Sequence, residues 1–350
     1  MTSTDTVGWF KDIGLDDRLQ VGGKGGSLGE LTRAGIAVPP GFVIKTHAFE
    51  RFLNALDRDV QIRARVQSVD PHNLDATTKL CREIRQGIEA AALPADVLEE
   101  VTSAYEALFA GREMSPIAVR SSATTEDAAD ASFAGLQDTY LWVTNVQQML
   151  TRVRSCWASL YSVESVTYRR QRGVPEEAVA MAVVVQKMVN ARSAGVMFTR
   201  SPLTGDRSVI ALEGSWGLGS AVVGGEVTPD RWVIGKITGE ISVREISDKR
   251  HQHVPITEGG VECVPVADEL RQTPCLSDAE LEMLRTIARK VERHYGAPQD
   301  IEWAVERETN KIYLLQSRPE TVWSAKEAQS VARPASDPMV HVMNIFGGQR

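Results

Sequence analysis

The sequence has few cysteines, no long apolar run and no excess of basic residues. Its four cysteines stand far apart in 350 residues without a CxxC pair, which favours reduced thiols in a cytoplasmic protein. The longest apolar run, residues 178–185, is far too short to span a bilayer and is typical of a buried strand. The formal net charge of -7 argues against a nucleic-acid-binding surface. We therefore expect neither a membrane segment nor a nucleic-acid partner.

The N-terminus also lacks the features of a secretion signal. Residues 1–20 carry several charged side chains and leave no room for the apolar core of a signal peptide. Apolar and charged residues make up 43% and 24% of the chain, which is ordinary for a globular protein. A chain of 350 residues is long enough for one large core or for two to three smaller ones.

Two alternating segments near the C-terminus, residues 300–305 and 312–320, predict a hairpin with polar side chains on one face. The charged segment between them carries Asn310, which suits a chain reversal. If the register places Glu302 beside Gln316, two oxygens and the Arg318 guanidinium converge on one ligand. Such a set suits a magnesium ion that holds a polyphosphate. An edge hairpin whose polar face meets water is the alternative.

A glycine-rich segment, residues 21–28, places Lys24 among four glycines just before a helical pattern. Glycines allow close approach of a ligand to the backbone, and the lysine supplies a charge for phosphate. The spacing matches neither a Walker A loop nor a GxGxxG fingerprint. A flexible turn before a helix therefore remains an alternative.

A short apolar segment, residues 116–123, predicts a strand that carries Arg120 and two serines toward a loop of small residues. An arginine at this place and the N–H groups of the loop are typical of phosphate binding. A solvated loop is the alternative. Farther along, residues 145–172 predict one amphipathic helix.

The apolar segment 178–185 leads into a polar link at residues 190–193, and a strand is expected from residue 194. Two lobes could hinge at this link, and its backbone groups could bind an adenine. A capping box at Ser277 and Glu280 begins a helix that ends at Gly296. His251 and His253 alternate as on a strand, but no acidic or thiol partner stands at ligand spacing, so we expect no metal site there.

Taken together and in order, these motifs closely resemble the nucleotide-binding domain of the phosphoenolpyruvate synthase and pyruvate phosphate dikinase family. The resemblance covers roughly residues 15–325. It is carried by residues 21–25, 38–42, 118–123, 131–135, 186–189, 195–199, 216–219, 300–303 and 316–320. The family implies an α+β ATP-grasp fold, in which two lobes clasp ATP between mixed sheets.

The resemblance also implies roles for individual residues. It implies an N-terminal lobe over residues 1–190 and a C-terminal lobe over 191–325, and the polar, irregular residues 326–350 predict a tail or docking segment. Glu302 and Gln316 match the magnesium ligands of the family. The residues that match its nucleotide contacts are Lys24, Arg120, Gly135, Thr139, Gln186, Gln316 and Arg318. Among these, Lys24, Arg120 and Arg318 would neutralise charge that develops on the phosphates, so we expect them to act in catalysis.

The chain departs from the family pattern in two ways. Ser220 stands where a glutamate is expected after residues 216–219. In addition, none of the six histidines has the Gly-Gly-x-x-Ser-His-like context of the histidine that carries phosphate in this family. We therefore expect that histidine, and the acceptor-binding domain, on another polypeptide, unless the chain is a piece of a longer protein.

The resemblance predicts an ATP-binding subunit that uses Mg²⁺ and donates the β-phosphoryl group of ATP, as pyrophosphoryl, to a histidine of a partner subunit. The products would be AMP and phosphate, and a small acceptor such as a phenol would be phosphorylated, as in phenylphosphate synthase. Alternatives are the ATP domain of a phosphoenolpyruvate synthase or of a rifampin phosphotransferase. A regulatory subunit without turnover and a self-sufficient ATP-grasp ligase that makes ADP also remain open.

Overall fold

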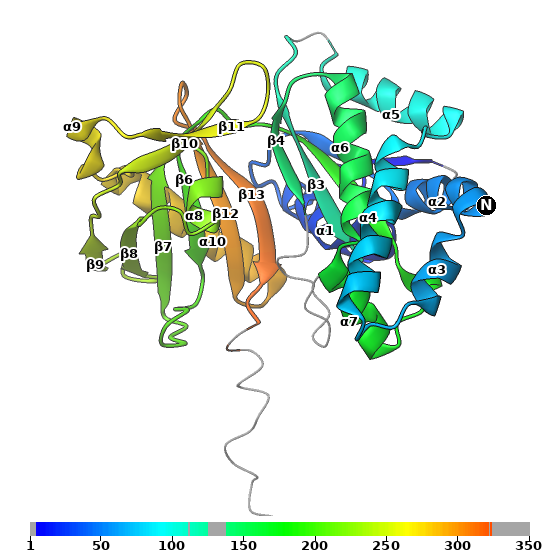
Figure 1. The fold of residues 1–350 in the computed structure, drawn as a ribbon. Coiled ribbons are helices and arrows are strands. Elements are labelled where there is room, and N and C mark those ends of the chain that lie inside the picture. The colour runs from blue at the N-terminus through cyan, green and yellow to red at the C-terminus, as the bar shows by residue number, and fades with distance from the viewer. Residues whose placement is uncertain (1–4, 111–112, 125–137, 322, 324–350) are drawn as a thin grey trace, which may run out of the picture.

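The computed structural model describes residues 5–110, 113–124, 138–321 and 323, and each of its two lobes is built on one sheet (Figure 1). The five-stranded sheet has the order β1-β2-β5-β3-β4, and the six-stranded sheet has the order β13-β12-β6-β7-β8-β9. The expected two-lobed α+β fold is confirmed. The expectation of mixed sheets was wrong, because every pair of named strands in the described residues is antiparallel. Short connections such as those from β6 to β9 reverse the chain direction and so impose this arrangement.

The sheet of the N-terminal lobe is covered by helices on both faces. Its strands are β1 (Val7–Trp9), β2 (Gly41–Ile44), β3 (Ile117–Ala123), β4 (Thr139–Val143) and β5 (Met181–Lys187). One face packs against α2 (Thr46–Val60), α3 (Ile62–Ser68), α4 (Leu74–Ala90), α5 (Ala95–Leu108), α6 (Val146–Ser159) and α7 (Val163–Arg172). The opposite face packs against α1 (Arg18–Arg33). Strand β5 is buried on both faces, with Val183 and Val185 in the core beside α2 to α7 and Ala182 and Val184 in the core beside α1. Burial on both faces explains its continuous apolar sequence.

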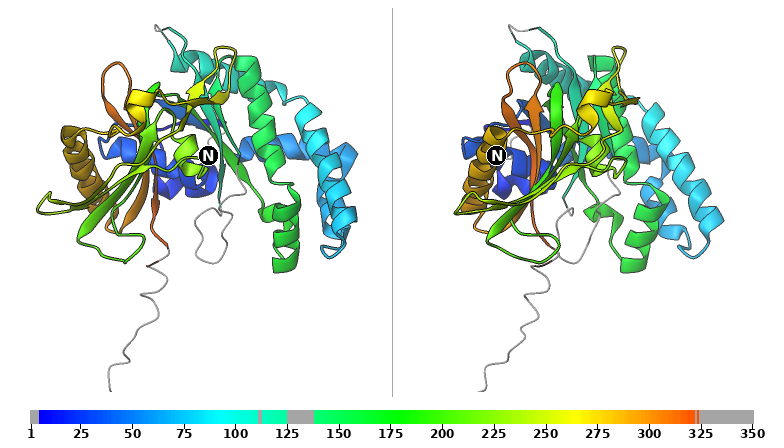
Figure 2. Two further views of the ribbon diagram at one scale, coloured as in Figure 1. Left: turned by 60° about the vertical axis from the view of Figure 1, so that its left-hand side comes forward. Right: turned by 90° about the vertical axis from the view of Figure 1, so that its left-hand side faces the viewer.

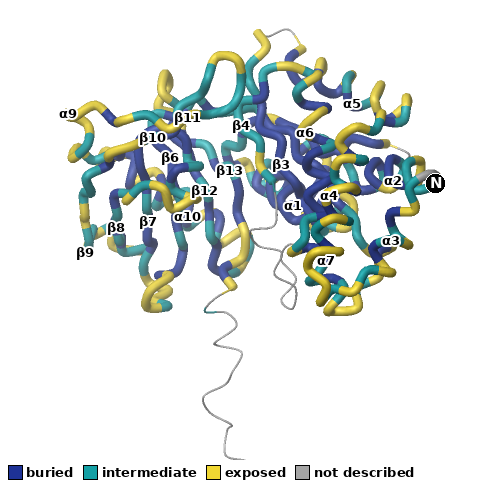
Figure 3. The backbone as a smooth tube through the Cα atoms, viewed as in Figure 1, coloured by how far each residue is buried: buried dark blue, intermediate teal, exposed yellow. Residues whose placement is uncertain are grey.

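The C-terminal lobe packs its sheet against α10 (Asp278–Tyr295). Its strands are β6 (Ala191–Phe198), β7 (Val209–Trp216), β8 (Asp230–Gly235), β9 (Ile241–Glu245), β12 (Gln299–Glu306) and β13 (Ile312–Pro319). A separate ribbon of β10 (His251–Pro255) and β11 (Val261–Pro265) and the short helices α8 (Ser220–Val223) and α9 (Asp268–Arg271) complete the lobe. Figure 2 shows the two lobes from two further directions, and Figure 3 shows a buried core in each.

Contacts of helix α1 and of the β10–β11 ribbon are among those that join the lobes. Helix α1 contributes Leu31 to the core of the C-terminal lobe, and its Ser27 hydroxyl donates a hydrogen bond to the Ser317 carbonyl. The turn of the β10–β11 ribbon reaches the N-terminal lobe, where the Gly260 N–H donates to the Trp142 carbonyl at 3.0 Å.

The local predictions hold at most helix ends and fail at one. Ser277 and Glu280 form the expected capping box of α10, and Gly296 ends that helix in the left-handed conformation. The single helix expected over residues 145–172 was wrong, because α6 ends at Ser159 and α7 begins at Val163. Ser162 supplies the physical reason, since its hydroxyl accepts the Ser165 N–H at 3.1 Å and caps a new helix.

The division into lobes at residue 190 and the docking role of residues 326–350 remain predictions. The strands of the first sheet lie within residues 7–187 and those of the second within residues 191–319. The predicted tail lies outside the described residues. Within the described parts of the chain, no helix has both the length and the apolar character required to cross a membrane.

Candidate functional site

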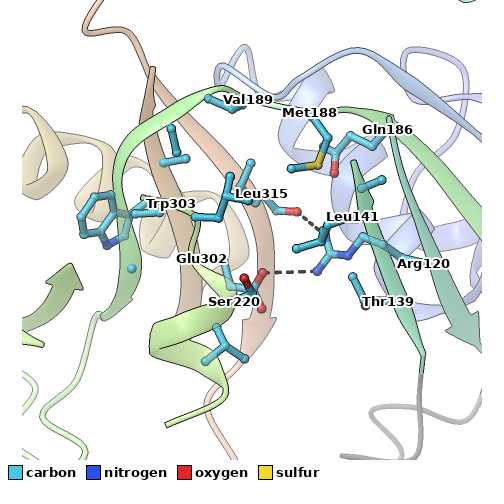
Figure 4. A pocket seen from close by; sticks show the side chains of 18 of the residues that line it. Arg120, Thr139, Leu141, Gln186, Met188, Val189, Ser220, Glu302, Trp303 and Leu315 are labelled. Atoms are coloured by element: carbon cyan, nitrogen blue, oxygen red, sulfur yellow. Dashed lines mark hydrogen bonds and ion pairs between the residues drawn. The ribbon is translucent and has the colours of Figure 1, made fainter. Parts of the chain in front are cut away.

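A cavity of about 370 Å³ lies between the two sheets and is lined by residues of both (Figure 4). Its wall is largely apolar toward the link between β5 and β6, with Leu141, Met188 and Leu218 among the lining residues. Polar residues line it from β3, β4, β5, α8 and β12. These are Arg120, Thr139, Gln186, Lys187, Ser220 and Glu302. An apolar wall with a few convergent polar groups is typical of a small-molecule site.

Arg120 is the polar group that joins the two lobes. Strand β3 places it opposite Thr139 on β4, and only 7% of its surface is exposed. Its Nη1 donates to the Leu315 carbonyl at 2.9 Å, and its Nη2 lies 3.2 Å from Glu302 Oε2 and 2.5 Å from Gln316 Oε1. The guanidinium is therefore held in a fixed orientation at the edge of the cavity by three oxygens of β12 and β13.

Glu302 and Gln316 face each other across the predicted hairpin. The register pairs Glu302 with Gln316, which is the condition that the sequence analysis set for a shared ligand site, and a bulge follows directly after Glu302. A bulge twists a strand and can redirect a side chain, which suits a position beside a cavity. The two oxygens already share one cationic partner, Arg120. A carboxylate and an amide oxygen are ligands that Mg²⁺ prefers, so the donor set fits this ion.

Two oxygens are only part of a magnesium site. The described residues contain no group of three or more His, Cys, Asp or Glu side chains that could hold a metal ion. Mg²⁺ keeps several waters and commonly takes further ligands from the phosphates of its substrate. The pair of Glu302 and Gln316 therefore fits an ion that arrives with a nucleotide better than one that resides in the protein.

Lys24 lies in the kinked first part of α1. Gly22 adopts a φ of 70° and a ψ of 177°, and an added Cβ would lie 2.1 Å from the Ser122 carbonyl oxygen. The Ser122 hydroxyl donates to the Val21 carbonyl at 2.9 Å and accepts the Gly25 N–H at 3.2 Å. The glycine-rich segment is thus fixed against β3 rather than flexible. Lys24 itself is buried and is not among the residues that line the cavity.

Arg318 is also absent from the cavity wall. Its side chain is half-exposed, and its Nε donates to Asp300 Oδ2 at 2.7 Å. Burial raises the pKa of the Asp300 carboxyl above its ordinary value, and the charge of Arg318 opposes that shift. Arg318 therefore sits on the same hairpin as Glu302 and Gln316 but has an acidic partner of its own. Its predicted contact with phosphate remains a prediction.

The link between the lobes is shorter than predicted. The polar break was expected over residues 190–193, but Ala191 already begins β6. The Arg307 N–H donates a hydrogen bond to the Asn190 carbonyl at 2.9 Å, and this contact holds the end of β12 alongside the link. The N–H groups of Lys187 and Met188 donate to the carbonyls of Pro40 and Pro116, each at 2.9 Å. These two donors are engaged within the protein.

The remaining predicted contacts have different outcomes. Thr139 and Gln186 line the cavity, and Gln186 Nε2 donates to the Pro39 carbonyl at 3.4 Å. Gly135 and the small-residue loop of residues 131–135 lie outside the described residues. The functional roles of all these residues remain predictions.

Sequence reasoning missed one constellation beside the cavity. From the sequence, His253 was considered only as a metal ligand, but its ring nitrogens lie 2.8 Å from Ser220 Oγ and 3.1 Å from Glu226 Oε2. The tertiary fold brings these partners together, because they stand 33 and 27 positions away along the chain. The one signal in the sequence was Ser220 itself, which departs from the family pattern.

Residues 18–337 match the family model for the pyruvate phosphate dikinase AMP/ATP-binding domain. The chain belongs to this family. The family model describes an AMP/ATP-binding domain, as the motifs predicted.

The relatives of this domain are longer proteins. The chain is similar to a probable phosphoenolpyruvate synthase of Staphylothermus marinus, with 39% identity over 94% of this chain and 43% of the relative. It is also similar to a rifampicin phosphotransferase of a Streptomyces species, with 40% identity over 89% of this chain and 35% of the relative. The chain thus spans less than half the length of either. Among solved structures, the chain is similar to the ADP complex of purK, N5-carboxyaminoimidazole ribonucleotide synthetase. The match covers 68% of this chain and 42% of the purK chain, with 10% identity and a TM-score of 0.26.

Proposed function

We propose that this chain is the ATP-binding part of a dikinase-type phosphotransferase that works with a partner subunit. It binds ATP with Mg²⁺ between its lobes and presents the β-phosphoryl group to a histidine of the partner. The products are AMP and a pyrophosphorylated histidine, from which phosphate is released before a small acceptor is phosphorylated. The relatives named phosphoenolpyruvate synthase and rifampicin phosphotransferase support the dikinase-type chemistry.

The observation that carries the proposal is the convergence of Arg120, Glu302 and Gln316 at the cavity. One nearly buried guanidinium from the N-terminal lobe meets an oxygen pair from the C-terminal lobe. A bidentate cation for phosphate and oxygen ligands for a metal are the two elements that phosphoryl transfer requires. No nucleophile on this chain is needed, since the catalytic effect is positional and electrostatic.

The residues of this chain have separate tasks in the proposal. Arg120 moves from the oxygen pair to the phosphates when a nucleotide enters, and Lys24 and Arg318 add positive charge on either side of it. Glu302 and Gln316 hold Mg²⁺, which would neutralise charge on the phosphates. The apolar wall near Met188 and Leu218 holds the adenine and excludes water.

The phosphate-carrying histidine is proposed to lie on a partner subunit. None of the six histidines of the sequence stands in a suitable motif, which supports a position of this histidine outside these 350 residues. Two of these histidines have hydrogen-bond partners within the protein: His253 contacts Ser220 and Glu226, and His294 contacts Glu30. An arrangement of separate subunits resembles phenylphosphate synthase, and we propose a phenol as the acceptor class.

The test is product analysis with ATP labelled in its β-phosphate. Purified protein is incubated with Mg²⁺, alone and with extract of the source organism, and an inhibitor of adenylate kinase suppresses AMP formed by that route. We expect AMP and an acid-labile, base-stable labelled protein only in the presence of extract. Glu302→Ala should abolish both, and Glu306→Ala, on the same strand but outside the cavity, should retain them.

Two outcomes would overturn the proposal. ADP made by the purified chain alone would favour a ligase with its own acceptor site. Nucleotide binding without labelled protein under either condition would favour a regulatory subunit without turnover.

A further inference from the structure

Three polar side chains form a continuous chain of hydrogen bonds that ends at the cavity. Ser220, at the first position of α8, lines the cavity, and its Oγ lies 2.8 Å from His253 Nδ1. On the other side of the ring, His253 Nε2 lies 3.1 Å from Glu226 Oε2. His253 is 8% exposed, whereas the Glu226 side chain is 56% exposed. A buried imidazole thus connects a carboxylate at the surface to a hydroxyl at the ligand site.

The backbone holds this arrangement in place. Strand β10 pairs with the glycine-rich segment before α8 through a parallel bridge between Gly217 and His253, and the Leu218 N–H donates to the His253 carbonyl at 3.0 Å. Gly217 has a φ of 76°, and an added Cβ would lie 2.4 Å from the His253 carbonyl oxygen. The glycine is therefore required for β10 to approach so closely. Ser220 and His253 are oriented by main-chain contacts as well as by their own hydrogen bond.

The chemistry of the three groups fixes the direction of the hydrogen bonds. The Glu226 carboxylate only accepts, so the neutral ring carries its proton on Nε2 and leaves Nδ1 as an acceptor. Ser220 must then donate its hydroxyl proton to Nδ1. The lone pairs of Ser220 Oγ remain for the cavity, and hydrogen bonds in a chain polarise one another. Ser220 therefore presents an acceptor, strengthened by the carboxylate behind it, to a hydroxyl or amino group of a ligand.

We propose that Ser220 accepts a hydrogen bond from a ribose hydroxyl of the bound nucleotide, and that His253 and Glu226 are positioning residues for this contact. The inference rests on the proposed function, because it takes ATP as the ligand. A serine at this position thereby provides the acceptor that a glutamate would provide directly. The negative charge of Glu226 reaches the ligand through the imidazole.

The choice of ribose follows from the donors that ATP offers. The phosphates carry few protons at neutral pH and bind cations, and Arg120 and Lys187 are the cationic residues that line the cavity. The adenine is a flat, largely apolar ring that suits the wall formed with Leu141 and Met188. Besides the adenine amino group, the two ribose hydroxyls are the remaining donors. An acceptor that lines the same cavity as Arg120 and Met188 suits the sugar that joins the two parts of the nucleotide (Figure 4).

The test is calorimetric titration with Mg²⁺ and ATP, 2′-deoxy-ATP or 3′-deoxy-ATP. Wild-type protein should bind ATP about 3- to 10-fold more tightly than one of the two deoxy analogues, the factor expected for one neutral hydrogen bond. Ser220→Ala should remove this preference by weakening ATP and the analogue that keeps the contacted hydroxyl, while the analogue that lacks this hydroxyl binds as before. Glu226→Gln, at an exposed side chain that need not affect folding, should reduce the preference and have no further effect in the Ser220→Ala background.

The matched control is Ser242→Ala, an exposed serine on β9 in the same lobe, which should keep the preference unchanged. Equal weakening of all three nucleotides in Ser220→Ala would overturn the inference, because it would show that the chain of hydrogen bonds only supports α8. Tight ATP binding by wild-type protein without any preference would overturn it too. If wild-type protein binds no ATP, the proposed function fails and this inference fails with it.

Discussion

Substitution of Glu302 by glutamine should change ATP binding in opposite directions with and without Mg²⁺. The glutamine keeps the shape of the side chain and an oxygen that accepts from Arg120. Arg120 also retains its hydrogen bonds to the Leu315 carbonyl and to Gln316. The perturbation therefore removes one negative charge from the cavity and little else. Without metal, this charge repels the phosphates of ATP, and with metal it is a ligand.

The structure sets the size of both effects. The Glu302 side chain is 28% exposed and lies 3.2 Å from Arg120, so the ion pair in the ligand-free protein contributes only about 1 kcal/mol or less to stability. Repulsion between the carboxylate and a phosphate, partly screened by solvent, amounts to about 1 to 2 kcal/mol. Without metal, Glu302→Gln should therefore bind ATP about 5- to 30-fold more tightly. With Mg²⁺, loss of the anionic ligand should weaken binding on the order of 10-fold.

The assay is calorimetric titration of wild-type and variant protein with ATP, once in EDTA and once with excess MgCl₂. Glu306→Gln is the control, because it makes the same chemical change on the same strand but outside the cavity. It should leave both affinities unchanged. If Glu302→Gln weakens binding by the same factor under both conditions, Glu302 does not act through a metal. The variant would then affect ATP through Arg120.

Two further predictions concern stability and pH. Gly22→Ala should lower the free energy of unfolding by about 2 kcal/mol or more in urea denaturation, since φ is 70° and the new Cβ meets the Ser122 carbonyl. The control Gly87→Ala, where the new Cβ has no atom within 4 Å, should raise the free energy of unfolding by about 0.5 to 1 kcal/mol. Equal effects of the two substitutions would contradict the account of the kink. Hydrogen bonds from Arg271 and then Arg250 lower the pKa of Asp248 from 3.8 to about 2, so its contribution to stability is complete above 3.8 and is lost as pH falls through about 2. Arg271→Gln should raise this pKa toward 3.8 in a carboxyl NMR titration, and an unchanged pKa would show that Arg271 is not the main cause.

Much of the fold was predictable where the sequence itself carries the physical constraint. The hairpin follows from strand alternation and from a reversing loop in which Asn310 adopts a φ of 54°. The pairing of Glu302 with Gln316 depends also on the bulge after Glu302, because uninterrupted pairing from Trp303 and Leu314 would place Leu315 opposite Glu302. The ends of α10 follow from a capping box and a glycine. The break between α6 and α7 was missed, since a serine cap at Ser162 competes with an apolar pattern that continues across it.

The candidate site was likewise predictable only in part. Residue types and their order indicated Arg120, Glu302 and Gln316, because motifs that bind phosphate and metal require particular donors at particular places on strands. The sequence did not indicate that Arg120 bridges both oxygens, since these residues lie 182 and 196 positions apart. It also did not indicate that Lys24 is buried and absent from the cavity lining.

Local sequence therefore determined most of the elements, the hairpin and the family of this protein, because each depends on short-range backbone geometry and on the chemistry of individual side chains. Tertiary structure alone decided which of those side chains meet. The contacts of Arg120 with β12 and β13, and of His253 with Ser220 and Glu226, form only when two sheets and a ribbon close around one cavity. Contacts of this kind depend on distances in space, for which separation along the chain gives no measure.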